Sequence, residues 1–138
     1  GDQAGFELRA ALARMAGQAS IYREAAQPFL DGHRAMVARV REAVQDGNLE
    51  AAARGAHELK GTASLLGATR LAAEAGRAEA QFRAGADGDE ARALAYALEA
   101  AVNEAVEALP AMLEDLAEAE RHQPGATALP GGEEYDDE

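Results

Sequence analysis

Apolar residues recur at helical spacing along most of the chain, and short stretches that contain glycine separate the periodic segments. Apolar positions at i, i+3, i+4 and i+7 are typical of amphipathic helices that bury one face. Runs of β-branched residues, which are typical of strands, are missing. The pattern predicts helices over about residues 6–15, 20–44, 49–66, 69–84 and 90–121.

Turn and capping residues mark the expected ends of these helices. Gly17 is expected to end the first helix, and Ser20 is a candidate N-cap for the second. Residues 46–48 predict a turn in which Asn48 caps the third helix. Gly67 is expected to end that helix, because glycine is the usual residue just after a helix C-terminus.

Two helices contain residues that disfavour a regular helix. Pro28 and Gly32 predict a kink or a late start in the second helix, and Pro110 predicts a bend or a break in the last one. The inward positions are expected to be Phe6, Leu8, Leu12 and Met15 in the first helix, Tyr22, Ala25, Phe29, Met36, Val40 and Val44 in the second, Leu71, Ala75, Ala78 and Phe82 in the fourth, and Leu94, Leu98, Val102, Leu109, Met112 and Leu116 in the last.

Amphipathic helices joined by short connections fold most simply as an antiparallel up-down bundle. We therefore expect an all-α domain over residues 1–121, an antiparallel up-down four-helix bundle with a short additional N-terminal helix. Residues 122–138 are rich in proline, glycine and acidic side chains and show no periodicity. They predict a disordered acidic tail.

The composition excludes several classes of protein. The formal net charge of −12 disfavours binding to nucleic acid or to an anionic membrane, because both attract clustered lysine and arginine. Without cysteine, neither a disulfide nor a cysteine-ligated metal site can form. No apolar run approaches the roughly 20 residues that span a bilayer, and no signal-peptide pattern is visible at the start.

The third predicted helix carries a histidine on an accessible face. At about 100° per residue, Leu59 and Leu66 point away from His57 and are expected to face the core. A structural histidine would lie among such leucines. His57 lies on the opposite face, so we expect that other molecules can reach it. Small residues and cations surround it instead: Ala53, Arg54, Lys60, Gly61 and Ser64.

A carboxylate is expected close to this histidine. Because the connection at Gly67 is short, the third and fourth helices should be antiparallel neighbours. His57 lies 10 residues before Gly67 and Glu79 lies 12 residues after it. At a rise of about 1.5 Å per residue, the two side chains should lie at similar height. Glu79 also flanks the apolar face of its helix, so we expect it to lean towards His57.

From His57 to about Glu79, the chain resembles the histidine phosphotransfer (HPt) domain of bacterial and plant phosphorelays. The pattern is His-x-Leu-Lys-Gly, followed by small residues and by Leu66-Gly67. In that family the histidine accepts a phosphoryl group from an aspartate of one receiver domain and passes it to another. The resemblance implies that His57 is the phospho-acceptor and that the partners are response-regulator receiver domains, which bring the aspartate and magnesium.

The resemblance also gives roles to the neighbours of His57. Glu79 matches the Glu or Gln that often orients the imidazole, holding the proton on one ring nitrogen while the other attacks. Lys60 would meet the phosphoryl oxygens as a point charge, and Gly61 would leave room for the partner. Arg54, Ser64 and Leu65 are further candidates for docking, and Leu65 occupies a place that is often polar in the family.

The sequence shows no ATP-binding pattern, no glycine-rich phosphate loop and no carboxylate cluster that would hold magnesium. We therefore expect a phosphoryl carrier that uses no cofactor or metal of its own and is not a complete enzyme. The chain begins with Gly1-Asp2 and no methionine, which favours a domain of a larger protein. The expected setting is the C-terminal domain of a hybrid sensor kinase. The domain itself would lie in the cytoplasm, and the kinase can be anchored in the membrane.

Two other functions stay open. The first is the phospho-acceptor domain of a chemotaxis-type histidine kinase, which has a similar His-x-x-Lys-Gly helix. The residues after Gly67 lack the acidic and histidine pattern of that group. The second is a docking bundle that has lost phosphorylation, which the intact His57, Lys60 and Gly61 disfavour.

The histidines also allow plainer interpretations. His57-Glu58 does not begin a zinc-protease His-Glu-x-x-His motif, because position 61 is glycine and the second ligand is absent. His33 and His122 have no Lys-Gly pair after them and are expected to be ordinary surface residues.

Overall fold

The structure is a computed structural model that describes residues 2–3 and 5–122. The elements follow in the order β1 (Asp2–Gln3), β2 (Phe6–Glu7), α1 (Leu8–Arg14), α2 (Ala19–Gln45), α3 (Leu49–Leu66), α4 (Thr69–Arg83) and α5 (Gly88–His122). Apart from His122, the predicted acidic tail lies outside the described residues. Contacts divide the chain into two units between Ala108 and Leu109, and α5 passes through both.

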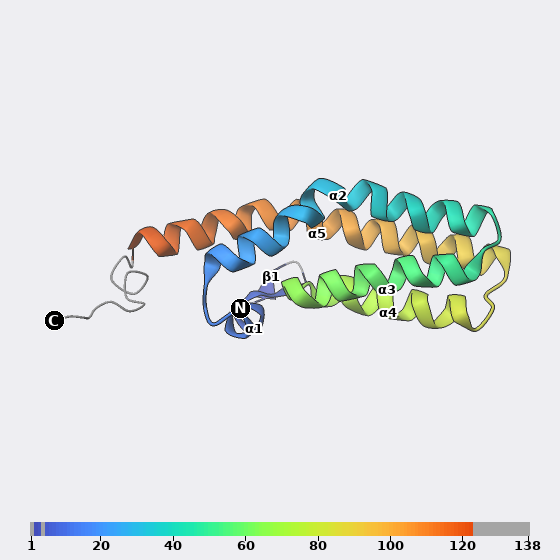
Figure 1. Cartoon of the computed structure of the whole chain (residues 1–138), viewed down its shortest axis with the longest axis horizontal. Helices are drawn as coiled ribbons and strands as arrows, with labels where there is room; N and C mark the ends of the chain where they lie inside the picture. Colours follow the sequence, from blue (N-terminus) through green and yellow to red (C-terminus); the bar gives the residue numbers. More distant parts are fainter. Residues whose placement is uncertain (1, 4, 123–138) are drawn as a thin grey trace. The chain divides into compact units, whose positions relative to one another are not determined.

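The first unit contains the predicted four-helix bundle, made by α2, α3, α4 and the part of α5 before Leu109 (Figure 1). α3 packs against both α2 and α4. Ion pairs join α5 to its two neighbours: Arg41 of α2 pairs with Glu99 at 2.9 Å, and Arg70 of α4 pairs with Glu104. The predicted all-α bundle is confirmed, and only the two short strands were not expected.

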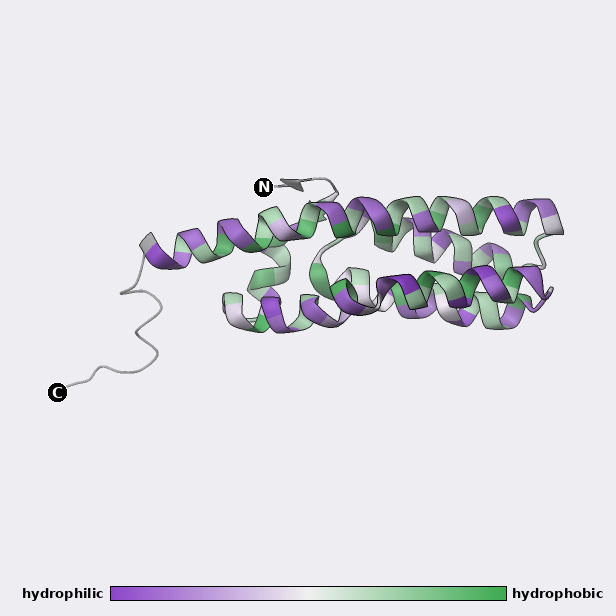
Figure 2. Ribbon diagram, turned by 90° about the horizontal axis from the view of Figure 1, so that it is seen from above, coloured by the Kyte–Doolittle hydropathy of each residue, from purple (hydrophilic) through white to green (hydrophobic). Residues whose placement is uncertain are grey.

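Hydrophobic and hydrophilic positions alternate along every helix of the bundle (Figure 2). The inward residues expected in α4 and α5 are all buried. In α2 the buried stripe differs partly from the prediction, because periodicity does not fix the rotation of a helix to within one position. The expected Tyr22, Phe29 and Val40 are buried. Ala26, Val37 and Ala43 are buried where Ala25, Met36 and Val44 were expected, and those three are half-buried.

Both ends of α3 are as predicted. The Asn48 side chain accepts a hydrogen bond from the amide of Ala51 at 3.1 Å. Gly67 adopts a left-handed conformation, with φ of 76°. A Cβ atom on Gly67 would lie 2.6 Å from the carbonyl oxygen of Glu7. Glycine is therefore required both for the turn and for the close approach of the N-terminal segment.

The prediction that Ser20 caps α2 is wrong. Gln18 is the N-cap, and its side chain makes no capping hydrogen bond. The Gln18 carbonyl accepts from the amides of Ile21 and Tyr22 at 3.1 and 3.3 Å. The helix therefore begins at Ala19, one residue before Ser20.

Of the two effects expected of Pro28 and Gly32, the structure has the kink and not the late start. α2 runs through both residues, and Figure 1 shows its axis changing direction along the way. α5 likewise runs through Pro110 without a break. None of the helices in the part of the chain that the structure describes is both long and apolar enough to cross a membrane.

The first predicted helix begins later than expected, at Leu8. Phe6 and Glu7 are extended and pair with β1 as an antiparallel two-stranded sheet. The Glu7 amide donates to the Gly67 carbonyl at 2.6 Å, and Phe6 forms a β-bridge with Ala68. Because these backbone groups bond to the α3–α4 turn, they cannot also take part in a helix.

α5 begins before the predicted Glu90, because two side chains at its start form a reciprocal cap. The Glu90 amide donates to the Asp87 side chain at 2.8 Å, and the Asp87 amide donates to the Glu90 carboxylate at 3.2 Å. This capping box starts the helix at Gly88.

Candidate functional site

His57 lies on the exposed side of α3, and 66% of its side chain is accessible. Leu59 and Leu66 are buried on the opposite side, as expected. Ala53, which the helical pattern placed near His57, is fully buried instead. α3 packs against α2 and α4 at once, so its buried arc is wider than one apolar stripe and includes small residues on both sides.

Glu79 of α4 holds one nitrogen of the His57 ring. The distances from His57 Nδ1 to the two carboxylate oxygens are 3.2 Å to Oε1 and 3.1 Å to Oε2. An ionised carboxylate can only accept a hydrogen bond, so Nδ1 must carry the proton. In the neutral ring Nε2 then keeps its lone pair. The contact therefore leaves Nε2 as the ring nitrogen with a free lone pair.

Glu79 is also bound by two cations. Its Oε1 lies 3.8 Å from Nζ of Lys60, and its Oε2 accepts from Arg83 Nη2 at 3.1 Å and Nε at 3.3 Å. Only 14% of the Glu79 side chain is exposed. Partial burial raises the pKa of Glu79, but hydrogen bonds from His57 and Arg83 and the charges of His57 and Lys60 lower it by more. The pKa therefore lies below its ordinary value, and the carboxylate is ionised at neutral pH.

Lys60 reaches Glu79 across a glycine of α4. A Cβ atom on Gly76 would lie 3.4 Å from Cδ of Lys60. The aliphatic stem of Lys60 therefore lies along the surface of α4 at the one place where that helix has no side chain. The ammonium group stays half-exposed beside the carboxylate of Glu79. From there it can turn towards an anion bound next to His57.

Gly61 lies one turn after His57 and faces open space. Apart from the adjoining backbone of α3, none of the residues that the structure describes lies within 4 Å of the position that a Cβ atom would take there, and no left-handed backbone conformation requires glycine. Glycine inside a helix costs about 1 kcal/mol relative to alanine. Folding alone would therefore favour alanine at this position.

The remaining predicted residues lie on either side of this centre. Arg54 pairs with Glu50 at 3.8 Å and lines an open groove on the N-terminal side of His57. Ser64 and Leu65 lie beyond Gly61, towards the C-terminal end of α3, where both are exposed.

Two residues of the site were missed by sequence reasoning. Arg83 follows Glu79 at i+4, a spacing at which Glu and Arg commonly pair, and this signal was available. Gly76 gave no comparable signal, because its role depends on the path that Lys60 takes across the neighbouring helix. Within residues 2–3 and 5–122, no three or more His, Cys, Asp or Glu side chains are grouped so that they could hold a metal ion.

Comparison with known families agrees with this geometry. Residues 24–119 match the family model described as Hpt domain, a range that includes the whole of α3 and α4. No curated protein and no solved structure matches the chain. The family match covers more than half of the sequence, so the chain belongs to the Hpt domain family, in which a histidine takes part in phosphotransfer within phosphorelays.

Proposed function

We propose that His57 accepts a phosphoryl group from the aspartyl phosphate of one response-regulator receiver domain and passes it to an aspartate of another. The observation that carries this proposal is the pair of contacts at 3.1 and 3.2 Å between His57 Nδ1 and the Glu79 carboxylate. They leave Nε2 of an exposed imidazole available for attack, which a phosphoryl carrier requires.

In the transfer step, Nε2 of His57 attacks the phosphorus atom of the receiver's aspartyl phosphate. The N–P bond forms while the P–O bond to the aspartate breaks, and its electron pair stays on the aspartate carboxylate. The proton remains on Nδ1, so the ring becomes positively charged. Glu79 stabilises that charge through the same hydrogen bond. Transfer to the second receiver is the reverse step, with a new aspartate as the nucleophile.

Each partner supplies part of the chemistry. The receiver brings the aspartate and magnesium, and the HPt domain brings the oriented nucleophile. Lys60 offers a positive charge to the phosphoryl oxygens, and Gly61 leaves room for the receiver's loops. Arg54, which pairs with Glu50, would contact the receiver on the N-terminal side of His57.

The wider setting is proposed from the resemblance alone. The domain of residues 1–121 would end a hybrid sensor kinase in the cytoplasm, with residues 122–138 as its acidic tail. The phospho-acceptor domain of a chemotaxis-type kinase is the alternative. In that case the phosphoryl group would come from the kinase domain's ATP instead of from a receiver.

The product of the reaction tests the proposal. The protein is incubated with receiver domains that carry a phosphoryl group, and the phosphorylated histidine is identified by ³¹P and ¹⁵N NMR. We expect one phosphohistidine, at Nε2 of His57. A phosphoryl group on Nδ1, or no transfer from any receiver, would contradict the proposed mechanism.

Glu79→Ala is expected to weaken the preference for the proton on Nδ1 and to slow phosphoryl uptake by about tenfold or more, because the ring loses its orienting partner. Glu79→Gln should keep most of the tautomer preference, since the amide oxygen still accepts. ¹⁵N NMR of His57 measures the tautomer ratio, and Glu74→Ala on the same helix is the matched control. If the tautomer ratio of His57 is the same in the parent, Glu79→Ala and Glu74→Ala, Glu79 does not orient the ring.

Lys60→Ala is expected to slow transfer within the complex by about tenfold, the effect of losing a hydrogen bond to a charged group. Binding of the receiver should change little, because the lysine acts on the phosphoryl group itself. Single-turnover transfer at saturating receiver measures the rate. Arg77→Ala removes a cation of α4 that pairs with Glu74 instead and serves as the control. An unchanged rate in Lys60→Ala would show that the ammonium does not meet the phosphoryl group.

A further inference from the structure

A second groove lies on the C-terminal side of Gly61, where three parts of the chain meet. Its volume is about 500 Å³, and it is open to solvent. The N-terminal segment, residues 5–15, forms one wall, and the end of α3 and the start of α4 form the others. The lining of the groove includes Gly61, Ser64 and Leu65 of α3, Ala72 of α4, and Glu7 and Arg14 of the N-terminal segment.

We propose that Glu7 and Arg14 complete the surface on which the receiver domain docks. Both residues precede residue 24, where the match to the Hpt family begins. This chain would thus use a segment outside the family's common domain to recognise its partner. The inference rests on the proposed phosphotransfer at His57.

The groove and the acceptor histidine lie on one continuous face of α3 and α4. Along α4, the spacing of Ala72, Gly76 and Glu79 places them on the same side of the helix. Ala72 lines the groove, Gly76 lies beside Lys60, and Glu79 bonds to His57. Gly61 of α3 borders the groove one turn after His57. A partner that reaches His57 therefore also lies over this groove.

The size of an ordinary interface leads to the same conclusion. A specific complex covers about 800 Å² on each partner, which corresponds to a disc with a radius of about 16 Å. At about 1.5 Å per residue, Leu65 lies only ~12 Å along the helix from His57. A receiver centred on His57 would therefore extend beyond the end of α3 and reach the N-terminal segment.

The character of the surface favours this side of His57 over the other. On the N-terminal side, the groove is lined by charged residues that include Arg39, Glu58 and Arg54. On the C-terminal side, Gly61 leaves the helix surface flat, and 48% of the Leu65 side chain is exposed. Apolar residues and arginine are enriched in interfaces, whereas lysine and acidic residues are depleted. Leu65 and Arg14 are residues of the enriched kinds.

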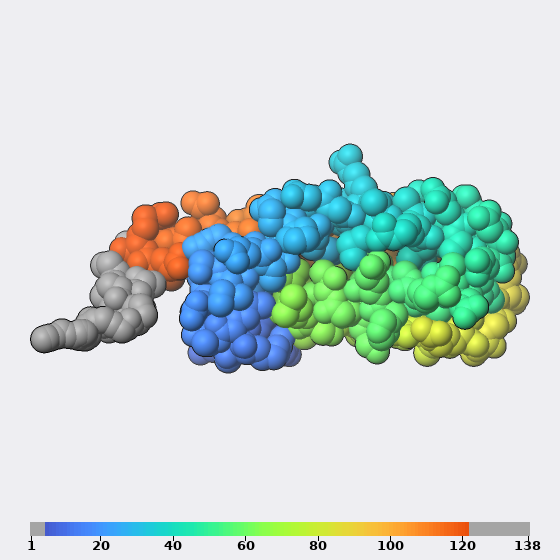
Figure 3. Space-filling view, viewed as in Figure 1, coloured from blue at the N-terminus to red at the C-terminus, as the bar shows by residue number. Residues whose placement is uncertain are grey.

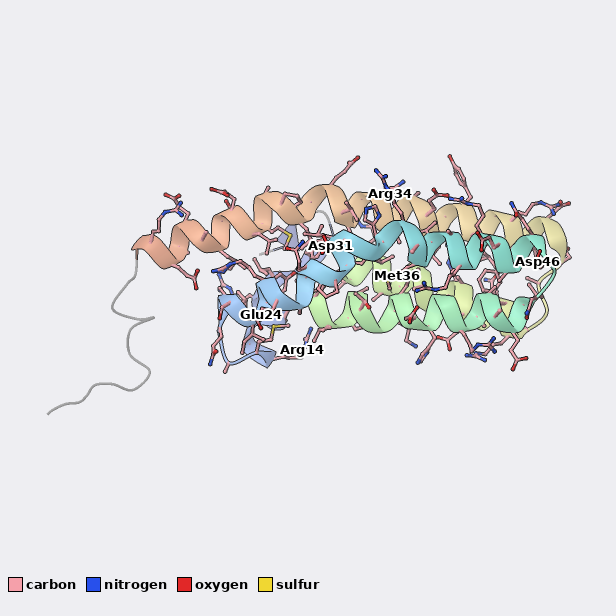
Figure 4. The ribbon with its side chains drawn as sticks, turned by 45° about the horizontal axis from the view of Figure 1, so that its top comes forward. Arg14, Glu24, Asp31, Arg34, Met36 and Asp46 are labelled. Atoms are coloured by element: carbon pink, nitrogen blue, oxygen red, sulfur yellow. The ribbon has the colours of Figure 1, made fainter. Side chains whose placement is uncertain are left out.

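Arg14 is held in place before any partner arrives. Its Nη2 donates to the Ser64 carbonyl at 2.7 Å, so the guanidinium lies at the C-terminal end of α3 (Figure 4). The space-filling view shows the N-terminal segment directly against that end of the helix (Figure 3). Fixing the side chain in advance lowers the entropy lost on binding. The guanidinium keeps further donors for acidic groups of the receiver.

The N-terminal segment as a whole is also anchored to the α3–α4 turn. The Thr69 hydroxyl and the Arg70 amide both donate to the Gly5 carbonyl, at 2.7 and 3.1 Å. Phe6 is almost completely buried. The wall that carries Glu7 and Arg14 is therefore attached to the helices that carry the site, and it can act as part of a preformed surface.

Affinity measurements on substituted proteins test the proposal. The probe is the unphosphorylated form of the receiver domain that transfers fastest to the parent protein. Arg14→Glu and Leu65→Ala are each expected to raise the Kd by about tenfold, because the first reverses a charge that faces the receiver and the second removes an apolar contact. Two controls match these variants. Arg9→Glu makes the same charge change at another position of α1, and Tyr96→Ala removes an exposed apolar side chain of α5. Both controls should bind as the parent does.

A second measurement needs no substitution and so does not depend on the folding of a variant. When receiver is added to the ¹⁵N-labelled parent, the amide signals of Glu7 and Arg14 should shift together with those of Gly61 and Leu65. If only the α3 and α4 signals shift, and Arg14→Glu binds as tightly as the parent, the N-terminal wall is not part of the interface. His57-dependent transfer would still occur in that case, whereas failure of the proposed function would remove transfer from the parent itself.

Discussion

His57→Gln is expected to abolish phosphoryl uptake from a phosphorylated receiver domain while leaving the fold unchanged. The lone pair of the glutamine amide nitrogen is delocalised into the carbonyl group, so the variant has no nucleophile at this position. Its amide can still donate a hydrogen bond to Glu79. Because 66% of the His57 side chain is exposed, the free energy of unfolding should change by no more than about 0.5 kcal/mol. Transfer of radiolabelled phosphate and chemical denaturation measure the two quantities.

The other two histidines provide the matched controls. His33→Gln and His122→Gln should accept the phosphoryl group at the rate of the parent. The His33 ring lies on α2 beside Phe29, with 6.3 Å between the ring centroids. Uptake that survives in His57→Gln, or that is lost with His33 or His122, would contradict the assignment of the acceptor.

The same experiment separates the proposed function from its alternatives. A chemotaxis-type acceptor would take its phosphoryl group from a kinase domain and ATP. Uptake from receivers would then be weak in the parent protein and not only in His57→Gln. A docking bundle would bind the receiver without any uptake. Only a phosphorelay carrier should show rapid uptake that depends on His57.

The boundaries of α3 and α4 were predicted to within one residue because local interactions determine them. Asn48 bonds to an amide three residues later, and Gly67 adopts a conformation that other residues avoid. The position of Glu79 beside His57 also followed from local quantities. A short turn and a constant helical rise place the two residues at the same height on neighbouring helices.

Several features that were predicted wrongly or missed depend on contacts between distant parts of the chain. Phe6 and Glu7 have helical neighbours in sequence, but their backbones bond to residues 67 and 68. Ala53 is buried because α3 has two packing partners, which a single apolar stripe does not indicate. Gly76 matters because the side chain of Lys60, from the neighbouring helix, lies against it.

Gly61 is the position where stability and function should respond in opposite directions. Gly61→Ala is expected to increase the free energy of unfolding by about 0.5–1 kcal/mol, because alanine is the better helix former and its methyl group would clash with none of the described side chains. The same methyl group would stand between His57 and the receiver, so binding should weaken. Gly61→Gln, with a longer side chain, should weaken binding by about tenfold or more.

Gly32 of α2 is the matched control for this prediction. It also lies within a helix, and an added Cβ atom would again contact no side chain in the described part of the chain. Gly32→Ala should therefore stabilise the protein to a similar extent without changing the affinity for the receiver. Denaturation and binding measurements on the three variants compare the two effects. If Gly61→Gln binds the receiver as tightly as the parent, the surface around Gly61 is not covered in the complex. The receiver would then have to reach Nε2 of His57 from another side.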